Sequence, residues 1–420
     1  MLLPGAAGDL STRYIMPALA HLHENDLLPD GFEVTGIGRR DWDDQDFREF
    51  VKKRLDAKDV EEKARRELLE SLTYRTADIT KRDQMQDAIG GSSEPVLAYL
   101  ALPPGIFPPA MQALSGMPDG SRIVVEKPFG EDLSSARKLN ELLHESFEED
   151  VFRADHFLGM KSLRDVFALR FANSVFGAAW SGENIERVEI VWDETLALEG
   201  RASYYDGAGA LKDLIQNHLL QTLCMLAMDA KDFRDKKVEL LRSVKKLSPE
   251  EVERQSVRAR YSSGSIDGRE VSAYTREDGV NPSRDTETFA EITLRIDDER
   301  WSGTPFTLRT GKALAENRQE IRAHFGETSG SPFEDGEANV LALPFAGDGL
   351  YLTINTAADG NARYLSRAEL AAKFAEQKLP AYGHLLLRAL RGDPAFFVRG
   401  DEAEESWRVV EPILEAWKEG

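Results

Sequence analysis

The sequence lacks the features of a secreted or membrane protein. Cys224 is the single cysteine among 420 residues, so no internal disulfide can form, which is typical of a protein of the reducing cytoplasm. No apolar run approaches the about 20 residues of a membrane-spanning helix, and the first residues, Met1–Gly5, show no charged or apolar signal region. We therefore expect a cytoplasmic protein without a membrane partner.

Positive charge is scarce as well. The chain has 53 Lys and Arg residues against 74 Asp and Glu residues, which gives a formal net charge of −21. Nucleic-acid binding requires a basic surface that replaces the counterions of the phosphates, so we expect no nucleic-acid partner. No Cys and His residues are spaced as ligands of a structural metal, and we predict no metal site. If the ligands are anions, the cationic residues that bind them must be concentrated locally.

The hydrophobic pattern changes character part-way along the chain. Up to residue 152, short apolar runs such as Val96–Leu100 and Ile123–Val125 alternate with helical patterns, which favours a doubly wound parallel sheet of the Rossmann-like kind. Further on, Ile185–Trp192 and Leu350–Ile354 alternate apolar and polar residues with period two. That pattern is typical of antiparallel strands with one wet face.

A chain of this length is too long for one typical hydrophobic core. We predict an N-terminal Rossmann-like domain over residues 1–152. A C-terminal α+β domain, with a large and mainly antiparallel sheet, is predicted over residues 153–420. The predicted fold class is therefore α/β plus α+β.

A glycine-containing turn, Gly5-Ala6-Ala7-Gly8-Asp9-Leu10, follows the first apolar run and precedes a helical pattern. Glycines at such a junction let backbone N–H groups approach a pyrophosphate at the positive end of a helix dipole. The strict dinucleotide fingerprint has a third glycine, and Ser11 stands at that position. The turn alone is equally compatible with a plain tight turn, but its location at the first strand–helix junction favours a dinucleotide site.

The end of the second predicted strand bears on the choice of dinucleotide. A carboxylate there is typical of NAD enzymes, whereas this chain has Gly38-Arg39-Arg40. Guanidinium groups suit the 2′-phosphate of NADP through forked, charge-assisted hydrogen bonds. Asp41 follows directly, so NAD remains compatible with the pattern. The alternative interpretation is a solvated basic pair.

A cation, a carboxylate and an imidazole lie close together in Arg153-Ala154-Asp155-His156, between an apolar run and a helical pattern. A pocket that binds an anion and orients a histidine explains this combination better than a structural need does. His218 interrupts the apolar face of a second helical stretch, 209–228. On its own it is most simply a core histidine. Asp155 favours catalysis, because a carboxylate can orient a histidine general base and stabilise its imidazolium.

These segments resemble the glucose-6-phosphate dehydrogenase family, and the match is closest to its shorter, divergent actinobacterial branch. The resemblance extends over nearly the whole chain, and the Glu-Lys-Pro-Phe-Gly and Gln-Asn-His motifs are highly specific in combination. The matching segments, in order, are Gly5–Leu10, Ala101–Pro104, Glu126–Gly130, Arg153–Gly159, Tyr204–His218 and Leu308–Leu314.

The resemblance implies oxidation of D-glucose 6-phosphate at C1 to 6-phospho-D-glucono-1,5-lactone with hydride transfer to NADP, at the entry of the pentose phosphate pathway. It implies His218 as the general base and Asp155 as the carboxylate that orients it. It further implies substrate ligands, namely His156, Lys127, Glu194, Asp213 and Lys312, and coenzyme ligands, namely Gly5, Gly8, Asp9, Leu10, Arg39 and Lys127. By residue type alone, most of these charged residues are equally compatible with solvated surface groups.

Two departures from the family pattern concern the substrate's phosphate. The family segment reads Asp-His-Tyr-Leu-Gly-Lys, whereas this chain has Phe157 for the Tyr and Met160 for the Lys. Lys161 follows, but one helical step rotates it by about 100°. Tyr14 also stands where the family has a lysine after the coenzyme turn. An alternative prediction is therefore an NAD(P)-dependent dehydrogenase of the same fold that acts on an unphosphorylated or otherwise substituted hexose.

The resemblance also implies an assembly. The C-terminal domain is expected to bind substrate and to mediate oligomerisation, as a homodimer or homotetramer. A non-catalytic relative is a third alternative, which the retention of Lys127, Asp155, His156 and His218 disfavours.

Overall fold

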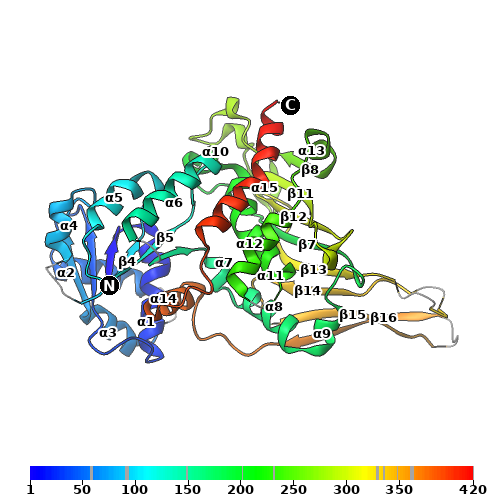
Figure 1. The fold of residues 1–420 in the computed structure, drawn as a ribbon, viewed down its shortest axis with the longest axis horizontal. Coiled ribbons are helices and arrows are strands. Elements are labelled where there is room, and N and C mark those ends of the chain that lie inside the picture. Colours follow the sequence, from blue (N-terminus) through cyan, green and yellow to red (C-terminus); the bar gives the residue numbers. More distant parts are fainter. Residues whose placement is uncertain are drawn as a thin grey trace. The chain divides into compact units, whose positions relative to one another are not determined.

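The chain folds into two compact units. The computed structural model describes residues 1–56, 60–89, 94–147, 150–200, 202–229, 232–327, 331–333, 336–347, 349–359 and 364–419 (Figure 1). Unit 1 comprises Met1–Met160 and Gln377–Glu404, and unit 2 comprises Lys161–Glu376 and Glu405–Gly420. This division differs from the expected boundary after residue 152. The segment Gln377–Glu404 was expected in the second domain, but it belongs to unit 1 because it packs into the hydrophobic core of that unit.

The core of unit 1 is a six-stranded sheet in the order β3-β2-β1-β4-β5-β6, in which all neighbours pair in parallel. The order reverses between β1 and β4, and ligands of doubly wound sheets bind at the carboxyl ends of the strands at such a point. The predicted Rossmann-like sheet is thus confirmed. Its strands are β1 (Leu2–Pro4), β2 (Val34–Gly38), β3 (Leu72–Thr76), β4 (Leu97–Leu100), β5 (Arg122–Glu126) and β6 (Val151–Ala154).

Helices connect these strands, as parallel pairing requires. The first connection begins with a short π-helix, and one connection contains a 3₁₀ turn. The helical elements are η1 (Ser11–Ile15), α1 (Met16–Glu24), α2 (Asp44–Leu55), α3 (Glu62–Glu70), α4 (Arg82–Ile89), η2 (Pro104–Ile106), α5 (Phe107–Leu114), α6 (Leu133–Phe147), α7 (His156–Gly159) and α14 (Ala381–Arg391), and α15 (Gly400–Glu419) begins in this unit.

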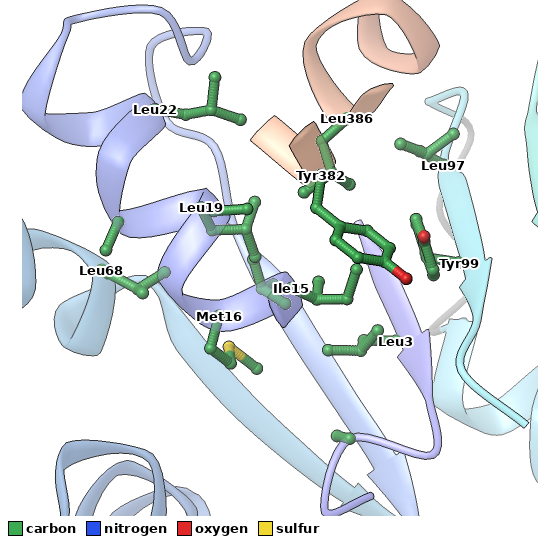
Figure 2. Close-up of a cluster of buried hydrophobic side chains, with 14 of the residues drawn as sticks. Leu3, Ile15, Met16, Leu19, Leu22, Leu68, Leu97, Tyr99, Tyr382 and Leu386 are labelled. Atoms are coloured by element: carbon green, nitrogen blue, oxygen red, sulfur yellow. The ribbon is translucent and has the colours of Figure 1, made fainter. Parts of the chain in front are cut away.

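Helix α14 packs against α1 in the hydrophobic core of unit 1. Figure 2 shows Tyr382 and Leu386 of α14 among Ile15 and Leu19 at the start of the first helical segment and Leu3 of β1. Burying a large apolar side chain contributes about 1.5–3 kcal/mol. The segment from α14 onward is therefore an integral part of this unit. It also adds an isolated bridge between Val398 and the last strand of the sheet.

Unit 2 is built on an eight-stranded sheet in the order β16-β15-β14-β13-β7-β12-β11-β8. Strands β7 and β12 pair in parallel, and the other neighbours in this order pair antiparallel. The predicted, mainly antiparallel sheet is confirmed. Its strands are β7 (Ile185–Asp193), β8 (Ser256–Ala259), β11 (Phe289–Arg295), β12 (Pro305–Gly311), β13 (Arg318–Phe325), β14 (Val340–Pro344), β15 (Gly349–Ala357) and β16 (Leu365–Lys373).

The helices of unit 2 include a long π-helical segment, η3, that continues directly into α11. A small hairpin of β9 (Gly264–Ile266) and β10 (Arg269–Val271) stands apart from the large sheet. The helical elements are α8 (Lys161–Ala172), α9 (Ser174–Ala179), α10 (Ala202–Ala210), η3 (Leu211–Leu219), α11 (Leu220–Ala227), α12 (Phe233–Ser243), α13 (Pro249–Gln255), η4 (Tyr274–Arg276), η5 (Pro282–Arg284) and η6 (Glu299–Trp301).

Helix α11 is buried along its whole length, so its last carbonyl groups cannot bond to water. Arg170 donates to the carbonyls of Met225 and Met228 instead. The indole N–H groups of Trp180 and Trp301 donate to the carbonyls of residues 226 and 227. Burial lowers the pKa of Arg170 to about 9. The end of this helix is therefore fixed by side chains from three other segments. Within the described part of the chain, no helix is long and apolar enough to cross a membrane.

Candidate active site

The glycine turn at the end of β1 has the geometry of a phosphate cradle. Gly5 has a φ of 84°, and a Cβ atom there would lie 2.3 Å from the carbonyl oxygen of Ala101. The N–H of Gly8 donates to the carbonyl of Gly5 at 2.9 Å, and the Ser11 hydroxyl donates to the same carbonyl at 3.0 Å. Ser11 therefore closes the turn at the position where the strict fingerprint has its third glycine. A glycine turn of this geometry that leads into the N-terminus of a helix is typical of pyrophosphate-binding sites.

The other two predicted residues of this turn lie nearer to solvent. Asp9 is exposed and forms an ion pair of 3.1 Å with Arg13. Leu10 is half-buried and stands at the N-terminal boundary of the π-helix η1.

Two arginines follow β2, and their surroundings differ. The guanidinium of Arg40 lies over the ring of Trp42 at 4.5 Å and near the ring of Phe50 at 5.1 Å. Arg39 is exposed at the carboxyl end of the strand. Hydrogen bonds from Thr80 lower the pKa of Asp78, and the charge of Arg39 contributes to that shift. An exposed guanidinium at the carboxyl ends of the parallel strands is of a type that can bind a phosphate.

The end of β5 carries a buried carboxylate beside Lys127. Glu126 is 6% exposed, accepts a hydrogen bond from the Tyr99 hydroxyl and directly precedes Lys127. Burial raises the pKa of Glu126 to about 7, and the charge of Asp155 adds to this shift, while the Tyr99 hydrogen bond and Lys127 oppose it. Lys127 is half-buried, and its peptide bond to Pro128 is cis. Lys127, Glu126 and Asp155 thus share one electrostatic environment within unit 1.

Asp155 and His156 lie at the end of β6, beside β5. The carboxylate of Asp155 is 1% exposed and caps the short helix α7 by accepting from the N–H of Phe157 at 3.0 Å. The imidazole of His156 stacks on the ring of Tyr382 at 5.5 Å and meets the ring of Phe157 edge-on at 5.2 Å. The local sequence provides the cap, and α14 orients the imidazole.

Glu194 and Lys312 come together in unit 2, because they follow the parallel neighbours β7 and β12. The Lys312 ammonium lies 2.5 Å from a carboxylate oxygen of Glu194 and 5.6 Å from the centre of the Tyr205 ring. Lys312 is 6% exposed. The two turns are also joined by their backbones, since the N–H of Leu314 donates to the carbonyl of Glu194 at 2.9 Å. This pair offers both a cation and a carboxylate to a polyhydroxylated ligand.

The π-helix η3 carries Asp213 and His218. The backbone N–H of Leu220 donates to the carbonyl five residues earlier, and the side-chain amide of Asn217 donates to the carbonyl of Lys212 at 2.8 Å. Residues five positions apart lie nearly one above the other in such a helix, whereas an α-helix would place them about 140° apart. Asp213 and His218 therefore share one side of η3. His218 is 1% exposed, as either interpretation of this residue requires.

The structure thus distributes the predicted site residues over both units. Unit 1 holds the glycine turn, Arg39, Lys127, Asp155 and His156, and unit 2 holds Glu194, Asp213, His218 and Lys312. Sequence reasoning missed Tyr382, which stacks on His156. No local signal indicates that contact, because Tyr382 belongs to an amphipathic helix far along the chain.

A Rossmann-like sheet with a glycine turn after its first strand, combined with a second unit that holds a buried histidine and a charged pair, is typical of NAD(P)-dependent dehydrogenases. The comparisons with known proteins agree with this class. A family model described as "Glucose-6-phosphate dehydrogenase, NAD binding domain" matches residues 2–164, and one described as "Glucose-6-phosphate dehydrogenase, C-terminal domain" matches residues 167–420.

Individual relatives match over almost the full length. Glucose-6-phosphate 1-dehydrogenase of Dickeya dadantii is 34% identical over 98% of this chain and 90% of its own, and the enzyme of Bacillus subtilis gives the same values. A solved glucose-6-phosphate dehydrogenase in complex with its substrate glucose-6-phosphate is 32% identical with a TM-score of 0.90, over 100% of this chain and 91% of that chain. The chain belongs to the glucose-6-phosphate dehydrogenase family.

Proposed function

We propose that the protein oxidises D-glucose 6-phosphate at C1 to 6-phospho-D-glucono-1,5-lactone and transfers the hydride to NADP. The observation that carries this proposal is the match of both family domains over residues 2–164 and 167–420. The site residues named from the sequence are supported by their positions at the strand ends of unit 1 and around η3 in unit 2. The reaction would supply the entry step of the pentose phosphate pathway.

In the proposed mechanism the imidazole of His218 removes the proton of the C1 hydroxyl. The C1–H bond breaks at the same time, its electron pair leaves with the hydrogen as hydride, and the C1–O bond becomes the lactone carbonyl. A bound nicotinamide coenzyme supplies the hydride acceptor. We assign to Asp155 the orientation of His218 and the stabilisation of its imidazolium, which is the ordinary role of a carboxylate partner.

The remaining residues are proposed as ligands. His156 binds the phosphate, Glu194 and Asp213 bind sugar hydroxyls, and Lys312 binds on the substrate side. Lys127 contacts both substrate and coenzyme. The turn of Gly5, Gly8, Asp9 and Leu10 receives the pyrophosphate, and Arg39 receives the 2′-phosphate, with NAD as an alternative coenzyme.

The general base is tested by substitution of His218. His218→Asn is expected to lower kcat for glucose 6-phosphate by at least about 10²-fold, because general base catalysis contributes that much or more. His144→Asn, at an exposed position of α6, serves as the control and is expected to leave kcat unchanged. NADPH formation is followed by its near-ultraviolet absorbance. If Asp155 acts through His218, Asp155→Asn lowers kcat, and the double variant is no slower than His218→Asn. An unchanged kcat in His218→Asn would remove this residue from the role of base.

The phosphate of the substrate is tested at Met160. This side chain is half-buried at the end of α7, and the neighbouring Lys161 is engaged with Asp165 at 2.5 Å. Met160→Lys is expected to raise kcat/KM for glucose 6-phosphate by about 10- to 150-fold, since a charged hydrogen bond contributes roughly 1.5–3 kcal/mol and about 1.36 kcal/mol corresponds to a factor of ten. The value for glucose is expected to stay the same. A wild-type preference for glucose over glucose 6-phosphate would support the unphosphorylated hexose instead.

We also propose a cytoplasmic homodimer or homotetramer. The hairpin of β15 and β16 presents exposed apolar side chains, among them Tyr351 and Leu370, and exposed apolar surface of this kind is typical of association sites. Light scattering of the purified protein measures the mass in solution, and a monomer at all concentrations would contradict this proposal.

A further inference from the structure

Glu287 lies just before β11 and reaches the start of the π-helix η3. Its side chain is buried, with 8% exposed. One carboxylate oxygen accepts a hydrogen bond from the N–H of Leu211 at 2.9 Å, and the backbone carbonyl of Glu287 accepts from the N–H of Ala210 at 3.1 Å. Glu287 therefore accepts hydrogen bonds from two N–H groups at the start of η3, where backbone N–H groups have no partners within the helix.

The backbone leaves room for this carboxylate at one residue. Gly209 interrupts the helical conformation between α10 and η3 with a φ of 74° and a ψ of 171°. A Cβ atom at Gly209 would lie 2.5 Å from one carboxylate oxygen of Glu287 and 2.7 Å from the other. The break in the helix and the contact with Glu287 thus occur together, and they fix the residue at which η3 begins.

The starting point of η3 matters because its other end is fixed as well. Helix α11 follows η3 directly, and the last carbonyls of α11 are bonded to side chains of unit 2, including Arg170. Between two fixed ends, a π-helix takes up more residues per turn than an α-helix does. If the first turn were released, the segment would be free to return to α-helical hydrogen bonding. Asp213 and His218 would then move from one side of the helix to positions about 140° apart.

The next residue, Thr288, anchors a second part of the site. Its carbonyl accepts from the N–H of Lys312 at 2.9 Å, and its own N–H donates to the carbonyl of Ala259 on the edge strand β8 at 2.8 Å. The segment 287–288 is therefore hydrogen-bonded both to the start of the π-helix and to the turn that carries Lys312. Lys312 in turn pairs with Glu194.

We propose that Glu287 is a positioning residue that holds η3 in the π-helical register in which Asp213 and His218 face the same side. The inference rests on the proposed dehydrogenase function for the importance of that side, but the hydrogen-bond geometry stands independently of it. Burial raises the pKa of Glu287, and the hydrogen bond from Leu211 opposes the shift. A glutamine, which keeps the acceptor oxygen and the side-chain length, is therefore the conservative replacement.

The experiment compares Glu287→Gln, Glu287→Ala and Ser248→Ala in the full chain. Ser248 caps α13 in the same unit, through the N–H of Glu251 at 3.3 Å, and far from the site residues in sequence. With glucose 6-phosphate and NADP, we expect Glu287→Gln to keep kcat/KM within about threefold of wild type. Glu287→Ala is expected to lower kcat/KM by at least about tenfold. A displaced His218 would lose part of the roughly 10²–10⁴-fold that a general base contributes. Ser248→Ala is expected to change only the melting temperature.

A second measurement does not depend on turnover. Amide hydrogen exchange is expected to accelerate at least about tenfold in Glu287→Ala over residues 214–219, and to match wild type there in the Gln variant. If the wild type reduces no NADP with glucose 6-phosphate, the proposed function fails, and exchange alone decides the role of Glu287. Equal protection of η3 in wild type and Glu287→Ala would overturn the inference. So would a lower melting temperature with unchanged kcat/KM per folded molecule, since that result identifies a purely structural cap.

Discussion

At the scale of single residues, buried polar groups carry most of the information about the site. Glu126 illustrates this, since its carboxylate is enclosed among Tyr99, Lys127 and Asp155 at the end of the parallel sheet. Burying a carboxylate disfavours its charged form unless hydrogen bonds and opposite charges compensate. Here the opposing effects leave a pKa of about 7, which means that Glu126 changes its charge near neutral pH.

Glu126→Gln is expected to reduce the pH dependence of stability. The folded-state pKa of about 7 lies above the ordinary value of 4.5, so between these pH values the folded protein retains a proton that the unfolded chain releases. The contribution of this group to stability is therefore largest below about pH 4.5 and is lost as the pH rises to about 7. The loss amounts to roughly 3 kcal/mol at 1.36 kcal/mol per pKa unit.

The free energy of unfolding in urea, measured between pH 4.5 and pH 8, tests this expectation. Glu141→Gln, at an exposed position of α6, is the control and should retain the wild-type slope. A Glu126→Gln variant whose stability falls with pH as steeply as the wild type would show that another group is responsible.

At the scale of elements, two of the motifs found in the sequence are associated with π-helices. The glycine turn leads into η1 and the Gln-Asn-His motif lies in η3. Such helices are uncommon and are frequently found at functional sites.

Helix α7 is constrained in another way, because it packs closely on α14. A Cβ atom at Gly159 would lie 2.3 Å from the carbonyl oxygen of Ala381, so the glycine sets the distance between these helices.

Gly159→Ala is expected to separate α7 from α14 and to destabilise unit 1 by about 1–3 kcal/mol, the usual cost of overpacking. Because His156 stacks on Tyr382 across this contact, KM for glucose 6-phosphate should rise as well. The urea midpoint and KM are the measurements. Gly105→Ala is the control, because no atom lies within 4 Å of its added Cβ. Equal effects of the two substitutions would show that the close contact is unimportant.

At the scale of the whole molecule, unit 1 is assembled from two separate parts of the sequence. Residues 1–160 supply the sheet, and Gln377–Glu404 supplies α14 and the strand-like contact of Val398 with Arg153. The ring of Phe397 meets that of Phe152 edge-on at 4.9 Å. The chain must therefore return to unit 1 after completing the large sheet of unit 2.

A fragment of residues 1–160 is expected not to unfold cooperatively, whereas the same fragment joined through a flexible linker to residues 377–404 is expected to do so. The second part contributes buried side chains such as Tyr382, Leu385, Leu386 and Phe397. At about 1.5–3 kcal/mol each, their loss is comparable with the about 5–15 kcal/mol that stabilise a typical domain. Circular dichroism during urea titration measures the transitions. A cooperative transition in the shorter fragment would contradict this account.

The sequence by itself determined the two kinds of sheet and the position of the glycine turn at Gly5 and Gly8. Apolar periodicity and turn residues depend on a few neighbouring positions, so they can be recognised without the fold. The tertiary structure alone decided that α14 lies beside α1, that Tyr382 stacks on His156 and that η3 is held as a π-helix from Glu287. A periodic pattern shows which face of a helix is buried, but not which distant segment covers that face. The pattern also does not show which distant carboxylate accepts hydrogen bonds from the first N–H groups of a helix. In η3 this partner sets the register in which Asp213 and His218 face the same side.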